Sequence, residues 1–594
     1  MRQGCPLSAY LFLLCIEILA QTIRNNNQIH GITCGQTEQK LSLFADDCTC
    51  LLKDTRSVQT TLQEINNFGL YSGLKLNTQK SVLYPISNKH QLKDNNLNLT
   101  IKTDTISLLG INLGQDKNIN YHHNVSEKCI TMQQNLNRWS QRQLSLVGKI
   151  LVTKSYAISK LIHTMTAMVV HKEDIRSIQQ AVNKFIWSNK PAKVKHDVLI
   201  NPLVEGGLNA IDIECQYKAL KLPWVWRLIR SSNWNSVIND TLRQFGGIRL
   251  LINCIFDSKT LANVPPFYRE VLKFWQEISI PTNCAKFVVW NNKNIKIAKQ
   301  TIYNEELFSK NVVFVHDFTK NGMFLSHSEF TERYNVTIAL TRFNGLLRAI
   351  KTYVQKYDIL EEIQNQPRPN LNLNRTCFQF ISGSILDISK AKSKLFYQEF
   401  LELKKNYPTA LTKWTDNHNI EEDTFYKSLP QTKVSTNESR MLAFQFKIIH
   451  NIINNYENLH KWGITETNEC QFCNAKTKDD IPHEFLACTW TQNIIMQILN
   501  EFNLIEKFQT ISNTEFLFGV ADKSINNIIL VIKYTIHMLR QQSRPFHMLG
   551  FKRELYKRII SDKRTLNKKI FDSKWESFPQ VVQEAQIFFN SLHV

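Results

Sequence analysis

Two adjacent carboxylates, Asp46 and Asp47, stand within residues 41–52, a short segment with apolar residues on both sides of the acidic pair. Mutual repulsion and removal from water both disfavour their ionised forms unless a cation lies close by. Oxygen ligands suit Mg²⁺, which keeps water and substrate phosphates as its other ligands. Two such ions activate a hydroxyl and stabilise a leaving pyrophosphate in nucleotidyl transfer, which is the chemistry this pair favours. The alternative is an ordinary polar hairpin turn, where aspartate is common.

Four residues further along have the types and spacing of zinc ligands: Cys470, Cys473, His483 and Cys488. A Cys-x₂-Cys turn aims both thiolates at one point. His483 and Cys488 are five residues apart, which on a continuous α-helix separates them by about 140°. We therefore expect a helix that begins near His483 and frays before Cys488. The alternative is a set of reduced side chains in a small hydrophobic core.

The segments around the acidic pair alternate between helix and strand patterns. Apolar residues recur at helical spacing in residues 6–25 and 57–71, and Gly73 follows at the position of a helix C-cap. Residues 41–52 predict a hairpin with Ala45, Asp46 and Asp47 at its tip. Residues 81–86 predict a strand, and another apolar run covers residues 106–113. This order indicates an α+β fold for the first part of the chain.

The charge balance favours a polyanionic partner. The chain of 594 residues has a formal charge of +21. Residues 1–115 hold 10 Lys/Arg against 8 Asp/Glu, residues 116–230 hold 17 against 8, and residues 552–569 hold 8 against 2. A nearly neutral body with basic flanks fits a protein that grips phosphates beside a metal site. A merely basic soluble protein is the alternative.

The thirteen cysteines and the N-terminal residues indicate a reducing compartment. The cysteine number is odd, and no charged region or cleavage site of a signal peptide opens the sequence. No uninterrupted apolar run reaches the roughly 20 residues of a membrane helix. We expect a nuclear and cytoplasmic protein that is not secreted and has no membrane partner.

The rest of the chain has a mainly helical pattern. Residues 121–235 show apolar residues on helical faces, and residues 366–370 predict a loop. The basic run at residues 552–569 is expected to form one face of a helix. Whether that face contacts nucleic acid is left open by the sequence.

Four segments, in order, resemble the motifs of reverse transcriptases, in particular the LINE-type enzymes of non-LTR retrotransposons. Residues 2–8 (RQGCPLS) with 11–12 (LF) resemble the segment that contacts template and incoming nucleotide, and residues 41–47 (LSLFADD) resemble the metal hairpin. Residues 72–81 (SGLKLNTQKS) resemble the following segment, and residues 108–111 (LLGI) resemble the primer-grip hairpin. Ala9 stands where the family usually has proline.

The resemblance implies a role for each matching residue. Asp46 and Asp47 would bind Mg²⁺ in a two-metal site, and Lys80 would assist the departure of pyrophosphate. Leu109 and Gly110 would form the primer grip. Contacts to template and incoming nucleotide would come from the first segment: Arg2, Gln3, Gly4, Pro6, Ser8 and Phe12.

The resemblance continues more loosely downstream and suggests a division into domains. Residues 144–149, 185–187 and 206–208 look like landmarks of the LINE-type thumb and the segment beyond it. The Cys and His residues, which follow residues 443–450 (AFQFKIIH) and precede Trp490, resemble a Zn²⁺-binding segment linked to RNA binding. We expect a partial reverse-transcriptase palm at 1–115, a basic helical thumb at 116–235, a mainly helical connecting region at 236–430, a small zinc-knuckle-like segment at 431–500 and a basic helical tail at 501–594.

The resemblance places one further metal-binding aspartate of the family before Arg2. We therefore expect the chain as written to be N-terminally truncated and inactive as a polymerase. As an RNA-directed DNA polymerase, the family's enzymes use an RNA template, a DNA primer or target, and dNTPs. A non-catalytic nucleic-acid-binding remnant and a pseudogene-like product with no selected role are the alternatives. A group II intron maturase fits less well, since those proteins usually carry Tyr-Ala-Asp-Asp.

Overall fold

The computed structural model describes residues 5–34, 37–86, 97, 99–230, 235–418, 420–431, 436 and 438–590. The chain forms two compact units, each assembled from separate stretches of sequence. Unit 1 consists of Met1–Lys128, Ile162–His171 and Tyr217–Phe400, and unit 2 of Cys129–Leu161, Lys172–Gln216 and Leu401–Val594. The described part mixes strands with a larger share of helix, so the predicted α+β class is confirmed. The boundaries of the five predicted domains stay a prediction.

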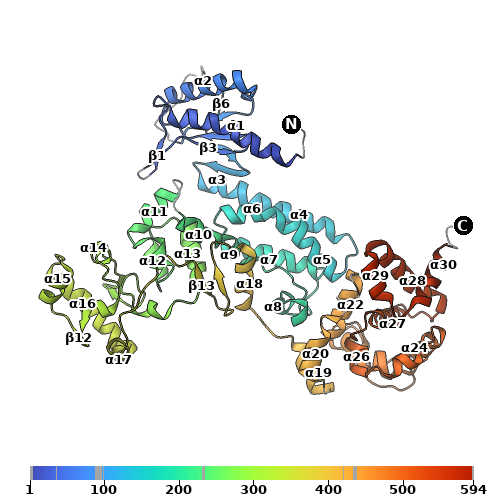
Figure 1. The fold of residues 1–594 in the computed structure, drawn as a ribbon. Coiled ribbons are helices and arrows are strands. Elements are labelled where there is room, and N and C mark those ends of the chain that lie inside the picture. Colours follow the sequence, from blue (N-terminus) through green and yellow to red (C-terminus); the bar gives the residue numbers. More distant parts are fainter. Residues whose placement is uncertain are drawn as a thin grey trace. The chain divides into compact units, whose positions relative to one another are not determined.

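Unit 1 begins with two helices that pack on a hairpin (Figure 1). Helix α1 (Pro6–Asn25) starts at a proline, whose missing N–H costs no intrahelical hydrogen bond at that position. Helix α2 (Thr55–Ser72) is capped by the Asp54 carboxylate, which accepts a hydrogen bond from the Ser57 N–H, and ends at Gly73 with φ 74°. Their buried faces enclose a small core. Its buried members are Ile16, Leu19, Ala20, Ile23, Ile29 and Leu41.

By length and composition, α1 is also the one described helix able to cross a membrane, with a mean hydropathy of 1.7. Only 22% of the apolar stretch of this helix is buried. Leu19, Ala20 and Ile23 on its buried face pack into the core shared with the hairpin and α2. The helix thus has a packing role within unit 1.

Two antiparallel hairpins carry predicted site residues in unit 1. Strands β3 (Leu41–Phe44) and β4 (Asp47–Cys50) pair Leu41 with Cys50 and Phe44 with Asp47, which confirms the predicted hairpin. Strands β7 (Thr105–Leu108) and β8 (Ile111–Gly114) pair Leu108 with Ile111. Leu109 and Gly110 between them have φ values of 48° and 78°. Two positive φ values are the geometry of a type I′ turn, which matches the twist of the flanking strands.

The remainder of unit 1 has its own core around the buried Trp290, Phe314 and Phe330. The predicted loop at residues 366–370 is confirmed, because these residues lie outside helix and strand. The predicted strand at residues 81–86 is shorter than expected and reduces to Val82–Leu83. The other elements of unit 1 are β1 (Ile32–Cys34), β2 (Thr37–Gln39), β5 (Val82–Leu83), β6 (Thr100–Ile101), α3 (Lys117–Tyr121), η1 (His122–Ser126), α10 (Pro223–Ile229), α11 (Ser236–Arg243), α12 (Gly247–Leu251), η5 (Ser258–Leu261), α13 (Pro266–Ile278), η6 (Asn283–Phe287), β9 (Lys296–Ile297), β10 (Gln300–Thr301), α14 (Glu305–Ser309), η7 (Val315–Phe318), β11 (Thr319–Lys320), β12 (Met323–Phe324), α15 (His327–Tyr334), α16 (Leu340–Tyr357), α17 (Leu360–Asn365), β13 (Cys377–Gln379) and β14 (Ile385–Asp387).

Unit 2 is built around α27 (Lys523–Gln542), which has more buried residues than any other described helix within residues 401–594. It contacts α22 (Ser439–Ile449), α24 (Thr489–Glu501), α28 (Met548–Thr565), α29 (Lys568–Trp575) and the short turn η8 (His483–Ala487). The basic run at residues 552–569 was predicted to form one helix face, and this was wrong. It covers most of α28 and the first two residues of α29, because the chain leaves the first helix after Thr565.

The N-terminal stretches of unit 2 pack beside α22. Helix α5 (Leu146–Val152) contacts both α22 and the amphipathic α7 (Lys172–Ile186). The remaining elements of this unit are η2 (Thr153–Ile158), α8 (His196–Leu199), η3 (Leu203–Glu205), α19 (Thr409–His418), α20 (Glu422–Ser428), α23 (Tyr456–Lys461), α25 (Ile505–Gln509), α26 (Asn513–Phe518) and α30 (Pro579–Asn590). Four helices have residues in both units: α4 (Glu127–Ser140), α6 (Ser159–Ala167), α9 (Ile213–Lys221) and α18 (Ser393–Glu402).

Gly206 and Gly207 make a turn of unit 2 that tolerates no larger residue. Gly206 has φ 81° and its carbonyl oxygen accepts a hydrogen bond of 2.6 Å from His450 Nε2 at the end of α22. A Cβ atom on Gly207 would lie 2.0 Å from the backbone oxygen of Asn201. The double glycine therefore permits a backbone approach that any side chain would block.

Candidate functional site

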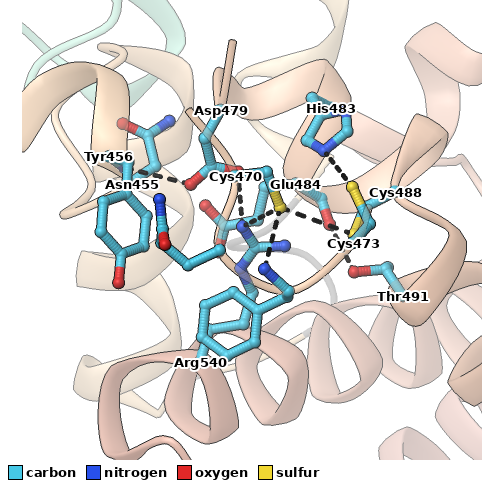
Figure 2. A network of polar contacts seen from close by, with 12 residues as sticks. Asn455, Tyr456, Cys470, Cys473, Asp479, His483, Glu484, Cys488, Thr491 and Arg540 are labelled. Atoms are coloured by element: carbon cyan, nitrogen blue, oxygen red, sulfur yellow. Dashed lines mark hydrogen bonds and ion pairs between the residues drawn. The ribbon is translucent and has the colours of Figure 1, made fainter. Parts of the chain in front are cut away.

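The four predicted zinc ligands converge in unit 2 (Figure 2). The ligand atoms of Cys470, Cys473, His483 and Cys488 all lie within 4.8 Å of one another. Cys470 Sγ is 3.9 Å from Cys488 Sγ, and Cys473 Sγ is 3.5 Å from His483 Nε2. Ligands at about 2.3 Å from a tetrahedral zinc would lie roughly 3.8 Å apart. The donor set and its spacing fit Zn²⁺.

The local backbone brings the four ligands together. A bridge between Glu469 and Lys478, with the Cys470 N–H donating to the Thr477 carbonyl, closes the loop that carries the first two cysteines. The helix predicted to begin near His483 and end before Cys488 is confirmed, as the π-helical turn η8. The Cys488 N–H donates to the His483 carbonyl at 2.8 Å, an i to i+5 bond. This wider turn reduces the angular separation that an α-helix would impose on the two ligands.

Polar groups next to the ligands fix their orientation. His483 Nδ1 lies 3.2 Å from Thr477 Oγ1, which leaves Nε2 toward Cys473. The Phe472 N–H donates to Cys470 Sγ at 3.4 Å. Such neighbours hold the tautomer and ring orientation of a ligating histidine and stabilise thiolate charge.

Helix α27 supplies a buried cation to the cluster. Arg540 Nη2 donates to Cys470 Sγ at 3.5 Å and to the buried carboxylate of Asp479, and both side chains are at most 3% exposed. Asp479 also accepts from the Tyr456 N–H at 3.0 Å. Three thiolates and one neutral imidazole around Zn²⁺ would carry a net charge of −1, so the Arg540 guanidinium would face two negative charges, this one and the Asp479 carboxylate. Figure 2 shows Arg540 between Asp479 and the cysteines.

The same helix contacts η8 through a second buried pair. His537 Nδ1 lies 2.8 Å from Glu484 Oε1, next to the ligand His483. The Thr491 hydroxyl donates to the Glu484 carbonyl oxygen. Neither Arg540 nor His537 has a local sequence signal, because both come from a helix distant in sequence from the ligands, and the sequence therefore did not predict them.

Burial and hydrogen bonding act in opposite directions on the thiols. Burial raises the pKa of the Cys470 thiol to about 11, although Phe472 and Arg540 oppose the rise. Burial also disfavours ionisation of Cys488, but a backbone hydrogen bond from Thr491 and the Arg540 charge outweigh it and lower the pKa. The surroundings thus prepare part of the negative charge that metal binding requires.

The acidic hairpin of unit 1 presents its carboxylates to solvent. Ala45 and Asp46 form the tip, with Ala45 at φ 52°, and Asp47 is the first residue of β4. Both aspartate side chains are exposed, and the Phe44 side chain is 65% exposed. The argument that burial makes the pair costly was therefore wrong, because the tip projects beyond the core. Adjacency of two carboxylates remains the reason to expect a cation.

A surface hollow of about 610 Å³ lies between α1 and β3. It is lined by Tyr10, Leu13, Leu14, Ile16, Glu17, Arg24, Leu41, Ser42, Leu43 and Ala45. Helix α1, which carries Pro6, Ser8 and Phe12, thus borders the strand that leads to the acidic tip, although these three residues do not line the hollow. Phe12 is half-buried against the core of the two helices and the hairpin.

The predicted primer-grip turn is supported from two directions. His163 Nε2 lies 2.9 Å from the Leu109 carbonyl oxygen, and Lys128 Nζ donates to the Gly110 carbonyl at 3.5 Å. Lys128 also donates to the Thr164 hydroxyl at 2.9 Å. The sequence did not predict these supporting residues, which have no motif of their own.

The remaining predicted site residues are Lys80, Arg2, Gln3 and Gly4. Lys80 is exposed in a turn after α2, where its N–H donates to the Asn77 carbonyl. No hydrogen bond or ion pair joins Lys80 to the acidic hairpin in the part of the chain that the structure describes. Arg2, Gln3 and Gly4 lie outside the described residues. The roles of all these residues stay predictions.

Two family models match the chain over the segments just described. The model for reverse transcriptase (RNA-dependent DNA polymerase) matches residues 1–113. The model for zinc-binding in reverse transcriptase matches residues 413–494, which include the four zinc-ligand residues. The chain is a relative of non-LTR retrotransposon reverse transcriptases.

Two further proteins, one of them encoded by a transposon, are similar to parts of the chain. An uncharacterized 149 kDa protein of transposon TX1 from Xenopus laevis is 24% identical over 294 residues, which are 47% of this chain and 22% of that protein. A putative ribonuclease H protein of Arabidopsis thaliana is 26% identical over 107 residues, which are 17% of each. The chain spans about a fifth of the length of these relatives.

Proposed function

We propose that the chain is the part of a non-LTR retrotransposon RNA-directed DNA polymerase that holds the acidic hairpin, a helical thumb and a zinc-binding segment. Its substrates would be an RNA template, a DNA primer or target, and dNTPs. The observation that carries the proposal is the exposed Asp46–Asp47 tip, which lies inside the reverse-transcriptase segment and beside α1. Such a protein would act in the nucleus and the cytoplasm.

In this proposal each unit has its own task. Asp46 and Asp47 would bind Mg²⁺, which supplies charge stabilisation for the attacking and leaving oxygens of the phosphoryl group. The Leu109–Gly110 turn, held by His163 and Lys128, would position the primer strand. Lys80 would stand near the departing pyrophosphate. Bound Zn²⁺ would stabilise the fold of the zinc-binding segment, and the folded segment would contact RNA.

Primer extension tests the polymerase proposal and its dependence on a further carboxylate. In the enzymes that this chain resembles, another metal-binding aspartate precedes the segment matched by residues 2–12. Two metal ions need carboxylates from both sides of the cleft. We expect little RNA-templated synthesis from residues 1–594 alone, and synthesis from a polypeptide that includes any in-frame coding sequence before Met1. Robust Asp46-dependent synthesis by residues 1–594 would contradict the need for that carboxylate.

A second candidate is nucleic-acid binding without chemistry. The formal charge of +21 and the Cys₃His cluster of unit 2 favour it, because neither depends on the acidic hairpin. In that case RNA binding by residues 1–594 would persist in an Asp46→Asn variant, and no polypeptide that includes upstream sequence would extend a primer.

A further inference from the structure

Four lysines of unit 2 gather where α5, the loop after α7 and α22 come together. Lys149 lies on α5, Lys190 and Lys193 lie in the loop between α7 and α8, and Lys447 lies on α22. Helices α5 and α22 are in contact, and so are α5 and α7. Lys190, Lys193 and Lys447 are exposed, whereas Lys149 is buried. We call these residues, together with Trp462, the lysine cluster.

Uncharged partners hold two of these lysines in place. Lys193 Nζ lies 3.2 Å from the centre of the Trp462 ring and donates to Asn454 Oδ1 at 3.4 Å. Lys149 Nζ donates to the Ser188 hydroxyl and lies 5.8 Å from the Phe185 ring centre. Aromatic faces and hydroxyls orient an ammonium group without neutralising it.

The lysine cluster has no carboxylate partner in the described part of the chain. Elsewhere in unit 2, exposed or half-exposed lysines form ion pairs: Lys404 with Asp212, Lys405 with Glu205, and Lys552 with Glu501. None of the recorded ion pairs includes Lys149, Lys190, Lys193 or Lys447. The positive charge therefore accumulates at this surface.

The lysines repel one another. Partial burial, followed by repulsion from Lys447 and Lys190, lowers the pKa of Lys193 to about 8. Burial and then Lys447 lower the pKa of Lys149. Like charges held together cost free energy, which an anion placed between them recovers. Several ammonium groups along one surface match the repeated charge of a phosphodiester chain better than a single small anion.

We propose that the lysine cluster is a binding surface for the phosphodiester backbone of a nucleic acid. The class of partner follows from the proposed function, on which this inference rests. The contact with the nucleic-acid backbone lies in unit 2 and does not depend on the acidic hairpin. Lys190, Lys193 and Lys447 contact phosphates from the exposed side. Lys149 adds a further positive charge beside them. The Trp462 ring lies against the Lys193 ammonium group.

Salt-dependent binding tests the proposal with the full chain of 594 residues. The triple variant Lys190→Gln, Lys193→Gln, Lys447→Gln removes the three exposed charges. The matched control, Lys172→Gln, Lys413→Gln, Lys427→Gln, removes three exposed lysines elsewhere in unit 2. Affinities for single-stranded RNA, single-stranded DNA and an RNA–DNA hybrid of one sequence are measured between 50 and 200 mM salt, with polyglutamate as competitor.

We expect the triple variant to flatten the slope of log affinity against log salt by about 2 to 3, and the control by less than one, since each phosphate contact contributes about 0.7 to 0.9. The wild-type chain should lose roughly 20- to 40-fold more affinity across this salt range than the triple variant. The three ligands show whether the backbone bound is RNA, DNA or a hybrid. Equal slopes for the two variants, or equally tight binding of polyglutamate, would overturn the proposal.

Protection from acetylation keeps the test valid if a variant folds poorly. A bound oligonucleotide should reduce acetylation of Lys190, Lys193 and Lys447 in the wild-type chain several-fold more than that of Lys172, Lys413 and Lys427. Equal protection of all six lysines would overturn the proposal. The proposed function would still stand in that case, provided that the wild-type chain binds nucleic acid. If the wild-type chain binds none of the three nucleic acids, both fail.

Discussion

At the residue scale, the Cys₃His cluster consists of four side chains whose ligand atoms lie within 4.8 Å of one another, near the spacing of a tetrahedral site. Replacing Cys488 by serine should reduce the zinc content of the purified chain from one ion to near zero, as measured by elemental analysis. A chelator should then lower the melting temperature of the wild-type chain but not of the variant. A free zinc concentration of 1,000 times the dissociation constant stabilises the folded chain by about 4 kcal/mol.

The exposed Cys377 is the matched control for Cys488, because serine there changes a free thiol outside the cluster. We expect Cys377→Ser to keep full zinc content and the chelator response. Equal zinc in the Cys488→Ser and wild-type chains would rule out the metal centre.

Arg540 links the zinc ligands to α27, and its loss should affect both the metal and the fold. Arg540→Gln would leave Asp479 as a buried, unpaired carboxylate, which costs about 3 to 5 kcal/mol. It should also weaken zinc binding by roughly 10- to 100-fold, the usual effect of removing a group that supports a ligand. Urea unfolding and competition with a chromogenic chelator measure the two effects.

Arg544→Gln changes an exposed arginine two residues beyond α27 and should alter neither quantity. If Arg540→Gln lowers stability and leaves zinc affinity unchanged, Arg540 supports the helix packing alone and not the thiolate charge.

At the scale of elements, the turn at Gly206 and Gly207 determines how η3 meets α22. Gly207→Ala should destabilise unit 2 by about 1 to 3 kcal/mol, because its Cβ meets a backbone oxygen that has no room to shift. Gly550→Ala is the matched control, since nothing lies within 4 Å of its Cβ position on α28. That change should stabilise by up to about 1 kcal/mol through helix propensity. Unfolding curves in which Gly207→Ala matches the wild type would contradict the packing described.

His450, at the end of α22, should make stability fall in mild acid. Burial lowers the pKa of its imidazole from 6.5 to about 4, although its hydrogen bond to Gly206 opposes the change. Because the folded-state pKa is the lower one, the unfolded chain binds the proton more tightly. Stability is full above pH 6.5 and declines as the pH falls toward 4, with about 2 kcal/mol lost by pH 5.

His450→Gln can keep a donor to the Gly206 carbonyl but cannot be protonated in this range. The difference in unfolding free energy between the wild-type and variant chains isolates His450, because the zinc ligands titrate in both. A difference that stays constant from pH 7.5 to pH 5 would contradict the buried neutral imidazole.

The sequence predicted the elements whose signals are local. The hairpin at Asp46 and Asp47 and the cap at Gly73 follow from neighbouring residues, and both are present. The turn at Leu109 and Gly110, which is also present, was implied only by the resemblance to the primer-grip hairpin. The exposure of the aspartates could not be predicted, because it depends on how far the tip projects from the core. Arg540 could not be predicted either, since only tertiary packing brings α27 to the cysteines.

At the scale of the whole molecule, the units combine distant stretches of chain. Residues 129–161 and 172–216 pack with residues 401–594, although the sequence suggested contiguous domains. Composition and periodicity report on neighbours along the chain, so they give no signal for such non-local pairing. The lysine cluster is one consequence, because its four lysines come from three separate segments.

The central proposal is that Asp46 carries the chemistry of an RNA-directed DNA polymerase, and RNA-templated nucleotide incorporation tests it most directly. The measurement uses the longest in-frame polypeptide with Mg²⁺ and compares Asp46→Asn with Asp54→Asn, a matched change at the cap of α2 where asparagine caps equally well. We predict that Asp46→Asn abolishes incorporation and that Asp54→Asn retains it. Incorporation that survives Asp46→Asn undiminished would contradict the account.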